Sequence, residues 1–329
     1  MPNPPEPVGI DRTDAEGAIA AAAKRCSNWG RWGADDVLGT LNFLDDAKRR
    51  EGAGLVRRGT SFSLAQSFDA NGPQKGWRRR TNPVHTMLDT GLDAERGTQG
   101  FPHGIGGADD VVFMPLQAST QWDGLGHIFD HGLAYNGRRA GDVVTSEGDR
   151  VTGIETAAAP IAGRGVLLDV GRAVGTDGEL PDGFAITAEH LEATIAAQGP
   201  SARVGRGDLV LVRTGRLARA RREGWGDYAG GPAPGLSFTT ADWLHRSEIA
   251  GIATDTWGFE VRPNEFDDAF QPLHQVAIPH IGLFIGEMWD LDALAADCAT
   301  DGVYEFLLVA APLPVTGAVG APVNPIALK

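Results

Sequence analysis

The stretch Gln117-Ala-Ser-Thr-Gln-Trp-Asp-Gly-Leu-Gly-His127 follows the apolar run Val111-Val-Phe-Met-Pro-Leu116. It places two carboxamides, a carboxylate and an imidazole within eleven residues. Alternate side chains of an extended segment point to one side, so the pattern predicts a shared strand face from Gln117 to Asp123. Gly124 and Gly126 indicate a turn before His127. Such a strand is typical of a metal or acid–base site, although a single histidine after a glycine-rich turn is also typical of a surface or core position.

A second group of polar residues lies near the other end of the chain. His274-Gln-Val-Ala-Ile-Pro-His280 is followed by Ile281-Gly-Leu-Phe-Ile-Gly-Glu287. Imidazole and carboxylate are ordinary ligands of a divalent metal, and a carboxylate after an apolar run is costly to bury unpaired. The alternative is that Glu287 caps a helix or pairs with an arginine, and that His274 lies on a helix surface.

Composition excludes several classes of protein. The 329 residues are 42% hydrophobic and 22% charged, as in an ordinary globular protein, and the net charge of −14 disfavours nucleic acid or an anionic membrane as a partner. No apolar run reaches the length of a membrane span. Two cysteines, Cys26 and Cys298, are too few for a disulfide framework. We therefore expect a cytoplasmic protein with a leader over residues 1–12 and one domain over 13–329.

Helical and extended patterns alternate along the chain, which predicts a mixed α/β domain with a largely buried sheet. Residues 67–110 are rich in Gly, Pro, Asp and Arg, and we expect a long loop with little regular structure there. The predicted helices span residues 13–24, 45–51, 187–198, 239–246 and 292–298, and the predicted strands 60–64, 165–170, 208–213, 249–255 and 304–310.

Together the two polar groups resemble the cyclase-like metal-dependent hydrolases, the family of bacterial kynurenine formamidase and isatin hydrolase. The resemblance runs from about Asn28 to Pro325. It implies a β/β/α layered (swivelling) domain, with Asp123 matching the family's metal-bridging Asp and His127 its catalytic His. His274 and Glu287 match the distal metal ligands, with a separation one residue longer than expected. The family's members are commonly homodimers or homotetramers, so we expect the same here.

The sequence departs from the family motif at three positions. Gln117 and Gln121 stand where well-studied members carry metal-binding His, and Leu125 replaces a Pro. The expected metal ligands are then Gln121, Asp123, His274 and Glu287. This set is oxygen-rich with one nitrogen, and it shifts the preference from zinc or magnesium towards manganese.

Such a metal would activate water and polarise a carbonyl, with His127 as general base and then acid. We therefore expect hydrolysis of a small amide, lactam or lactone. A lyase, isomerase or cyclase using the same groups is the alternative, and a non-catalytic binder of small carboxylates is a third. The chain has no nucleophile elbow, dinucleotide fingerprint or phosphate loop.

Substrate-facing residues are predicted from their positions. His131, Tyr135 and Asn136 follow the motif closely, His85 lies in the long loop, and Asp255 ends a predicted strand, where sites in α/β sheets often lie. Arg78-Arg-Arg80 offers positive charge for an anionic substrate, although a basic triplet is usually a solvated loop.

Overall fold

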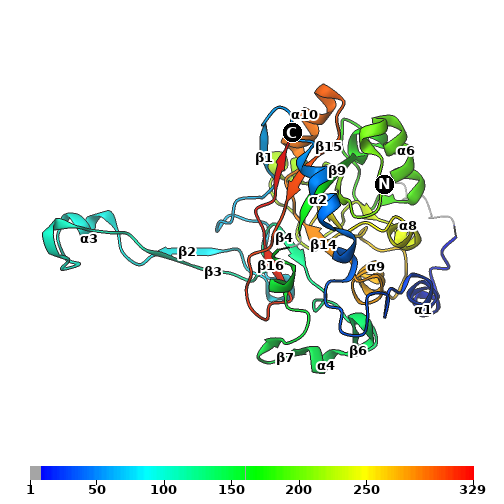
Figure 1. Cartoon of the computed structure of the whole chain (residues 1–329), viewed down its shortest axis with the longest axis horizontal. Helices are drawn as coiled ribbons and strands as arrows, with labels where there is room; N and C mark the ends of the chain where they lie inside the picture. Colours follow the sequence, from blue (N-terminus) through cyan, green and yellow to red (C-terminus); the bar gives the residue numbers. More distant parts are fainter. Residues whose placement is uncertain (1–8, 160) are drawn as a thin grey trace.

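A nine-stranded mixed sheet forms the centre of the computed structural model, which describes residues 9–159 and 161–329 (Figure 1). The strand order is β1-β17-β15-β9-β11-β13-β14-β4-β16. The four middle strands β9, β11, β13 and β14 are parallel, and the strands on both sides of them pair antiparallel. The strands are β1 (Ser61–Ser63), β4 (Gln121–Asp123), β9 (Ala162–Asp169), β11 (Leu209–Arg213), β13 (Gly251–Thr254), β14 (Phe284–Glu287), β15 (Glu305–Val309), β16 (Gly320–Pro322) and β17 (Ile326–Leu328).

Helices connect the parallel strands and cover the sheet (Figure 1). They are α1 (Ala15–Cys26), α2 (Asp46–Ala53), α3 (Gly91–Glu95), α4 (Ala140–Val143), α5 (Val170–Val174), α6 (Ala188–Gln198), α7 (Arg216–Glu223), α8 (Ala241–Arg246), α9 (Pro272–Val276) and α10 (Asp292–Asp301). Short 3-10 turns and one π-helical turn, Ala277–Ile281, lie between the helices. The remaining strands form four two-stranded pairs: β2 (Val84–Met87) with β3 (Asp110–Phe113), β5 (Leu133–Ala134) with β6 (Arg138–Arg139), β7 (Val144–Thr145) with β8 (Gly148–Asp149), and β10 (Ala185–Ile186) with β12 (Gly235–Leu236).

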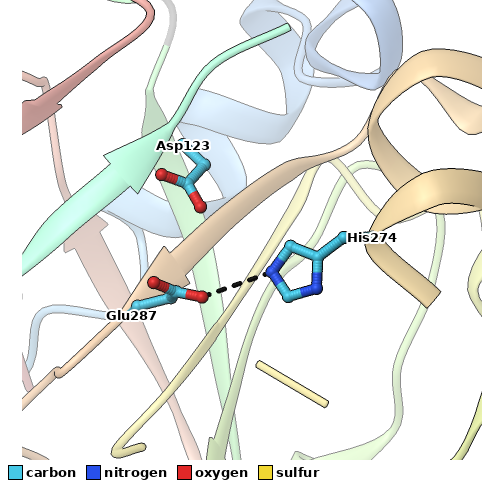
Figure 2. A group of neighbouring side chains, drawn as sticks. All are labelled: Asp123, His274 and Glu287. Carbon is cyan, nitrogen blue, oxygen red and sulfur yellow. Dashed lines mark hydrogen bonds and ion pairs between the residues drawn. The ribbon is translucent and has the colours of Figure 1, made fainter. Parts of the chain in front are cut away.

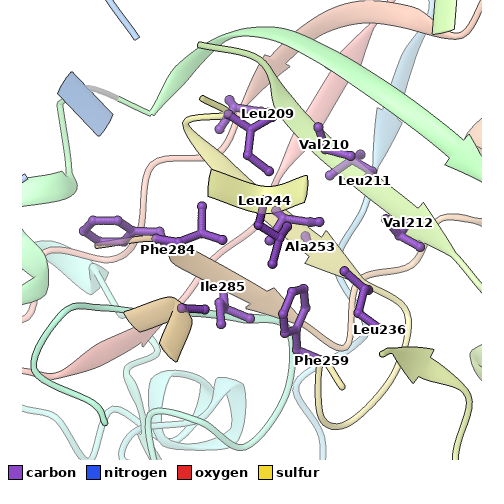
Figure 3. Close-up of a cluster of buried hydrophobic side chains, with 14 of the residues drawn as sticks. Leu209, Val210, Leu211, Val212, Leu236, Leu244, Ala253, Phe259, Phe284 and Ile285 are labelled. Carbon is purple, nitrogen blue, oxygen red and sulfur yellow. The ribbon is translucent and has the colours of Figure 1, made fainter. Parts of the chain in front are cut away.

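The middle strands are buried on both faces, which explains their nearly continuous apolar sequences. Leu209 to Val212 of β11 are fully buried and pack in one cluster with Phe284 and Ile285 of β14 (Figure 3). The predicted mixed α/β fold is confirmed, and so are the predicted strands that became β1, β9, β11, β13 and β15.

The predicted helices are also confirmed, with ends shifted by a few residues. The helix predicted over 187–198 is α6, and Thr187 caps it as expected. The partner of that cap is the imidazole of His190, which accepts a hydrogen bond from the Thr187 backbone N–H at 3.1 Å. The leader predicted for residues 1–12 lies mostly outside the described residues, which begin at residue 9.

The long loop predicted for 67–110 is irregular over most of its length, but β2, α3 and the start of β3 interrupt it. β2 and β3 form an antiparallel hairpin that carries α3 at its tip and projects away from the rest of the molecule as an arm (Figure 1). The first half of the apolar run before Gln117, Val111 to Phe113, therefore belongs to this arm, while Leu116 packs against the central core. The sequence resembles a loop because Gly and Asp are frequent there, whereas pairing between distant segments forms the hairpin.

Two strands near the C-terminus were not predicted. β16 pairs with β4, and β17 lies between β1 and β15. Each has only three residues in a proline-containing segment, so no periodicity distinguishes it from a loop. β16 matters for the site because it forms the edge beside β4. Within the described part of the chain, no helix has the length and apolar content needed to cross a membrane.

Candidate metal centre

Two neighbouring strands of the sheet bring three of the predicted site residues together. β4 and β14 pair antiparallel with Gln121 directly opposite Glu287 and Asp123 opposite Ile285. Residues that face each other across such a pair lie on one side of the sheet, and so do residues two positions apart. Gln121, Asp123 and Glu287 therefore share one face. Trp122 points to the other face, where it is fully buried and donates to the Ala310 carbonyl at 2.8 Å.

The predicted shared face does not extend back to Gln117. β4 begins only at Gln121, and the preceding residues form a turn. The Gln117 side chain instead packs against Gly320 of β16. The approach is so close that a Cβ added to Gly320 would lie 2.9 Å from Nε2 of Gln117.

His274 approaches this face from α9 and completes a buried triad (Figure 2). One ligand-type atom from each of Asp123, His274 and Glu287 lies within 4.8 Å of the others. All three side chains are almost fully buried, so the alternative of a surface histidine was wrong for His274. Glu287 bonds to Gln121, His274 and the Phe259 N–H, so the alternative of a cap on the following helix was also wrong. A triad of two carboxylates and an imidazole is a suitable ligand set for a divalent cation.

Glu260 orients His274, a role that sequence reasoning did not assign to it. Its carboxylate lies 2.5 Å from Nδ1 of His274 and accepts the backbone N–H groups of Leu273 and His274 at 3.1 and 3.0 Å. One buried side chain therefore caps the first turn of α9 and holds the ring, leaving Nε2 turned to Glu287 at 3.3 Å. A carboxylate behind a metal-ligating histidine commonly fixes its ring orientation and raises its basicity.

The charges of the triad indicate that a cation fits there. Burial, and then the nearby Glu287 carboxylate, raise the pKa of Asp123 to about 7. Burial disfavours a charged His274, but its hydrogen bonds with Glu260 and Glu287 outweigh this and raise its pKa to about 10. Buried carboxylates in contact repel each other, and a divalent cation between them would remove that repulsion.

The unpaired side-chain oxygen of Gln121 is a second indication of a cation site. Its Nε2 donates to Glu287 at 2.9 Å and to Asp123 at 3.3 Å, while its Oε1 is buried without a hydrogen-bond partner among the described residues. An orphaned amide oxygen beside two carboxylates is costly, and a carbonyl oxygen is an acceptable ligand for a hard cation. Gln121 therefore fits a metal site, although its nitrogen faces the carboxylates in this structure.

His127 lies beside the triad without belonging to it. Its Nε2 is 3.6 Å from Oδ1 of Asp123, and its side chain is about 9% exposed. Burial, followed by the positive charges of Arg80 and Arg78, lowers its pKa well below the usual 6.5. The ring is therefore neutral at neutral pH and able to accept a proton.

The predicted substrate-binding residues are not brought to the triad. His85 is exposed on the arm, where it pairs with Asp110. His131 is 59% exposed and bonds to Asp130 and Glu16. These two positions therefore remain predictions without support from the local geometry.

Two others have structural contacts in a loop near the N-terminal segment. The hydroxyl of buried Tyr135 donates to Asp36 at 2.8 Å, and the Asn136 amide bonds to the Gly30 N–H and to the Gly33 carbonyl. Asn136 takes a left-handed conformation with φ 66°, which asparagine tolerates better than most residues.

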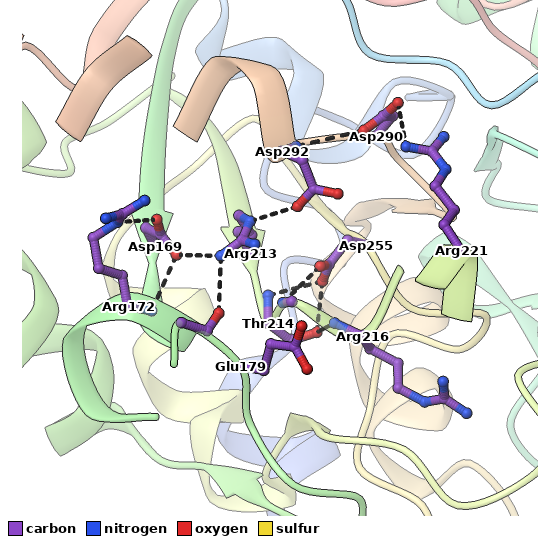
Figure 4. A network of polar contacts seen from close by, with 12 residues as sticks. Asp169, Arg172, Glu179, Arg213, Thr214, Arg216, Arg221, Asp255, Asp290 and Asp292 are labelled. Carbon is purple, nitrogen blue, oxygen red and sulfur yellow. Dashed lines mark hydrogen bonds and ion pairs between the residues drawn. The ribbon is translucent and has the colours of Figure 1, made fainter. Parts of the chain in front are cut away.

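Asp255 anchors the start of α7 instead of facing the triad (Figure 4). Its carboxylate accepts hydrogen bonds from the Thr214 N–H and hydroxyl and from the Gly215 N–H, at 2.7 to 2.8 Å. Burial raises its pKa to about 6, against the opposing charge of Arg213. Asp255 therefore has structural contacts at the start of α7, and its predicted role in substrate binding has no support from the local geometry.

Comparison with known proteins agrees with this architecture. Residues 62–261 match a family described as "putative cyclase". The crystal structure of a novel cyclase is 38% identical, covers 93% of this chain and 99% of its own, and superposes with a TM-score of 0.83. This chain belongs to the cyclase family. A search of curated proteins gave no significant match.

More distant solved structures share the fold. Isatin hydrolase A from Ralstonia solanacearum is 15% identical, covers 82% of this chain and 92% of its own, and has a TM-score of 0.59. A predicted metal-dependent hydrolase from Bacillus stearothermophilus is 17% identical, with coverages of 82% and 98% and a TM-score of 0.50.

Proposed function

We propose that the protein is a metal-dependent hydrolase of a small amide, lactam or lactone, with His127 as general base and acid. The observation that carries the proposal is the buried triad Asp123–His274–Glu287 with a neutral imidazole 3.6 Å from Asp123. Relatives of the same fold are described as isatin hydrolase and as metal-dependent hydrolase, which supports hydrolysis as the reaction class. The net charge of −14 favours a small molecule over nucleic acid or an anionic membrane as the partner.

Asp123, His274 and Glu287 would hold the cation, with Gln121 beside them. Two carboxylates, one imidazole and an amide oxygen favour manganese over zinc or magnesium. A divalent cation in such a site supplies Lewis acidity, which lowers the pKa of water and polarises a carbonyl.

The surrounding residues would position and deprotonate the water. Nε2 of His127 accepts its proton, because burial and the neighbouring arginines keep this ring neutral. Glu287 is held by the Phe259 N–H at 3.2 Å and by Gln121, so its oxygens do not swing away. The protonated His127 then returns the proton to the leaving nitrogen or oxygen.

The test is turnover of a panel of lactams, lactones and N-acyl compounds by chelated protein with added Mn²⁺, Zn²⁺ or Mg²⁺. Hydrolysis adds one water to the product, and oxygen from isotopically labelled water appears in the new carboxylate. We expect this result, lost with chelator and restored by metal. A product of unchanged mass would support an isomerase or cyclase instead, and metal-independent turnover would contradict the proposed site.

We also propose that the protein is a homodimer or homotetramer assembled through its arm. Two strands alone are marginally stable in water, and the arm has no core of its own. Nine large apolar side chains on it are 43 to 77% exposed: Val84, Met87, Leu88, Leu92, Phe101, Ile105, Val111, Val112 and Phe113. An apolar surface of this kind is typical of an interface, and symmetric association of identical chains is the commonest one.

Light scattering of the purified protein is expected to give two or four times the mass of one chain. Replacing Val112 and Phe113 with serine should shift the population towards the monomer. The control is Leu313→Ser, which changes a side chain that is 53% exposed on the body of the molecule. A monomeric native protein would contradict the proposal.

A further inference from the structure

The loop of residues 74–80 carries two arginines, Arg78 and Arg80, whose guanidinium groups form no hydrogen bond or ion pair with the described residues. Arg80 is 7% exposed, and its guanidinium makes no hydrogen bond or ion pair within residues 9–159 and 161–329. Its side chain contacts the face of Trp257, with Cζ 5.4 Å from the ring centroid. A guanidinium has five N–H donors. None of the Arg80 nitrogens is among the fully enclosed atoms, so its unpaired donors remain within reach of an anionic ligand.

The loop is anchored close to the triad. The Gln74 amide donates to the Ala118 carbonyl at 2.7 Å, just before β4, and accepts from the Trp257 indole at 3.3 Å. The same amide lies 3.9 Å from the sulfur of Met288, the residue that follows Glu287. The loop that carries the two arginines is therefore packed against segments next to both strands of the site.

Neither arginine is paired with a carboxylate of the triad. The described side chains form no hydrogen bond between Arg78 or Arg80 and Asp123 or Glu287, and those carboxylates bond to Gln121, His274 and Phe259 instead. Arg78 is exposed and held at φ 50°, a left-handed conformation that arginine rarely adopts. An exposed and a buried guanidinium two residues apart can together bind a planar carboxylate.

Aromatic rings border the same loop. Trp77 packs edge-on against Trp257 at 4.9 Å and lies 5.6 Å from the ring of Phe270, which is 52% exposed. Such rings offer an apolar wall beside the two cations. The substrate that fits both features has a carboxylate and a flat apolar part.

We propose that Arg78 and Arg80 bind the carboxylate of the substrate, which is a small anionic compound with its hydrolysable carbonyl at the triad. The inference rests on the proposed function, since it narrows the substrate class from amides, lactams and lactones in general to those that carry a carboxylate. It makes Arg80 the main specificity determinant, because packing against Trp257 fixes its side chain while its N–H donors have no acceptor among the described residues. Arg78 adds a second, solvent-facing contact.

Calorimetric titration of the metal-loaded protein with benzoate and with benzamide tests this without turnover. The two probes share a ring and a size but differ in charge. The native protein should prefer benzoate, and Arg80→Gln should reduce that preference roughly 10- to 100-fold, the range for hydrogen bonds to charged groups. Arg78→Gln should reduce it less, and Arg80→Lys should be intermediate because it keeps the charge and loses the planar fork.

Arg79→Gln is the matched control. Arg79 lies between the two arginines, is exposed and carries the same charge. It should leave the preference unchanged, and an equal loss there would overturn the proposal in favour of general surface charge. An undiminished preference in Arg80→Gln would also overturn it, because benzoate would then bind the metal alone. Metal content and thermal unfolding of each variant show that it is folded.

The two proposals fail in different ways. The protein could prefer benzoate in a way that depends on Arg80 and yet hydrolyse no compound of the panel. That result would support the carboxylate site and contradict the proposed hydrolase activity. Hydrolysis of neutral and anionic members of the panel with equal kcat/KM would keep the hydrolase and reject the carboxylate site.

Discussion

Asp123→Asn is expected to lower the affinity for a divalent cation roughly 100-fold or more, so that the purified variant carries little metal. Loss of a residue behind a metal ligand already costs about 10- to 100-fold, and removal of a charged ligand costs more. Asparagine keeps the size of the side chain and its place on β4 beside Gln121. The measurement is metal content after dialysis, followed by titration with Mn²⁺ and Zn²⁺.

Asp130→Asn is the control for that variant. Asp130 is also largely buried, but it bonds to Gln275, His131 and His280 outside the triad. It should retain the native metal content. Full occupancy in Asp123→Asn would mean that the site has been placed wrongly.

The metal should also bind in competition with a proton. Without a cation, Asp123 has a pKa of about 7 in the folded protein against 3.8 as its ordinary value. The folded state therefore holds more protons than the unfolded state between these values, and this group lowers stability as pH rises from 3.8 to about 7. Metal displaces the proton, so added Mn²⁺ should raise the Tm more above pH 7 than below it. At 100 times its Kd, a ligand of the folded state adds about 2.7 kcal/mol to stability. Asp123→Asn should lose the part of this pH dependence that lies near pH 7, while His274, with a pKa of about 10, retains its own competition between proton and metal at higher pH.

His127→Gln is expected to reduce kcat by about 100- to 10,000-fold, the usual contribution of a positioned general base. The metal content should not change, because Asp123, His274 and Glu287 remain. Glutamine keeps the polarity of the position but cannot take up a proton near neutral pH. The measurements are kcat with the substrate found in the panel and metal content of the same sample.

His245→Gln provides the comparison. His245 lies in α8, and the charged groups that act on it are Arg31, Asp242 and Glu248, none of which belongs to the triad. Its kcat should stay close to the native value. If His127→Gln kept native activity, or lost its metal, the role of His127 as base would be wrong.

The candidate ligands could be found from the sequence because their chemistry is local. Glu287 ends an apolar segment, where a carboxylate is costly unless it has a function, and Asp123 stands in alternation with Gln117 and Gln121. His127 and His274 were selected by their spacing from these acids and by the resemblance to a family.

Other contacts depend on segments that are distant in the sequence. Glu260 and His274 are fourteen residues apart, and no periodicity links them, because a turn at Gln271 (φ 52°) directs the chain into α9. In the sequence, Arg80 is one of three neighbouring arginines, a pattern typical of a solvated loop. In the structure it packs against Trp257 and is largely buried. His85 and Asp255 were assigned to the site from their positions in the sequence, and the structure gives them partners elsewhere.

The sequence by itself determined the α/β class, the buried middle strands and the identity of the charged residues suited to a metal, because burial and periodicity act on neighbouring residues. Only the tertiary structure decided that Gln121 faces Glu287, that Glu260 holds His274 and that residues 84–113 leave the body as an arm. Strand register and long-range pairing set these contacts. Each depends on which of many apolar segments become neighbours, and that choice is made by the packing of the whole core.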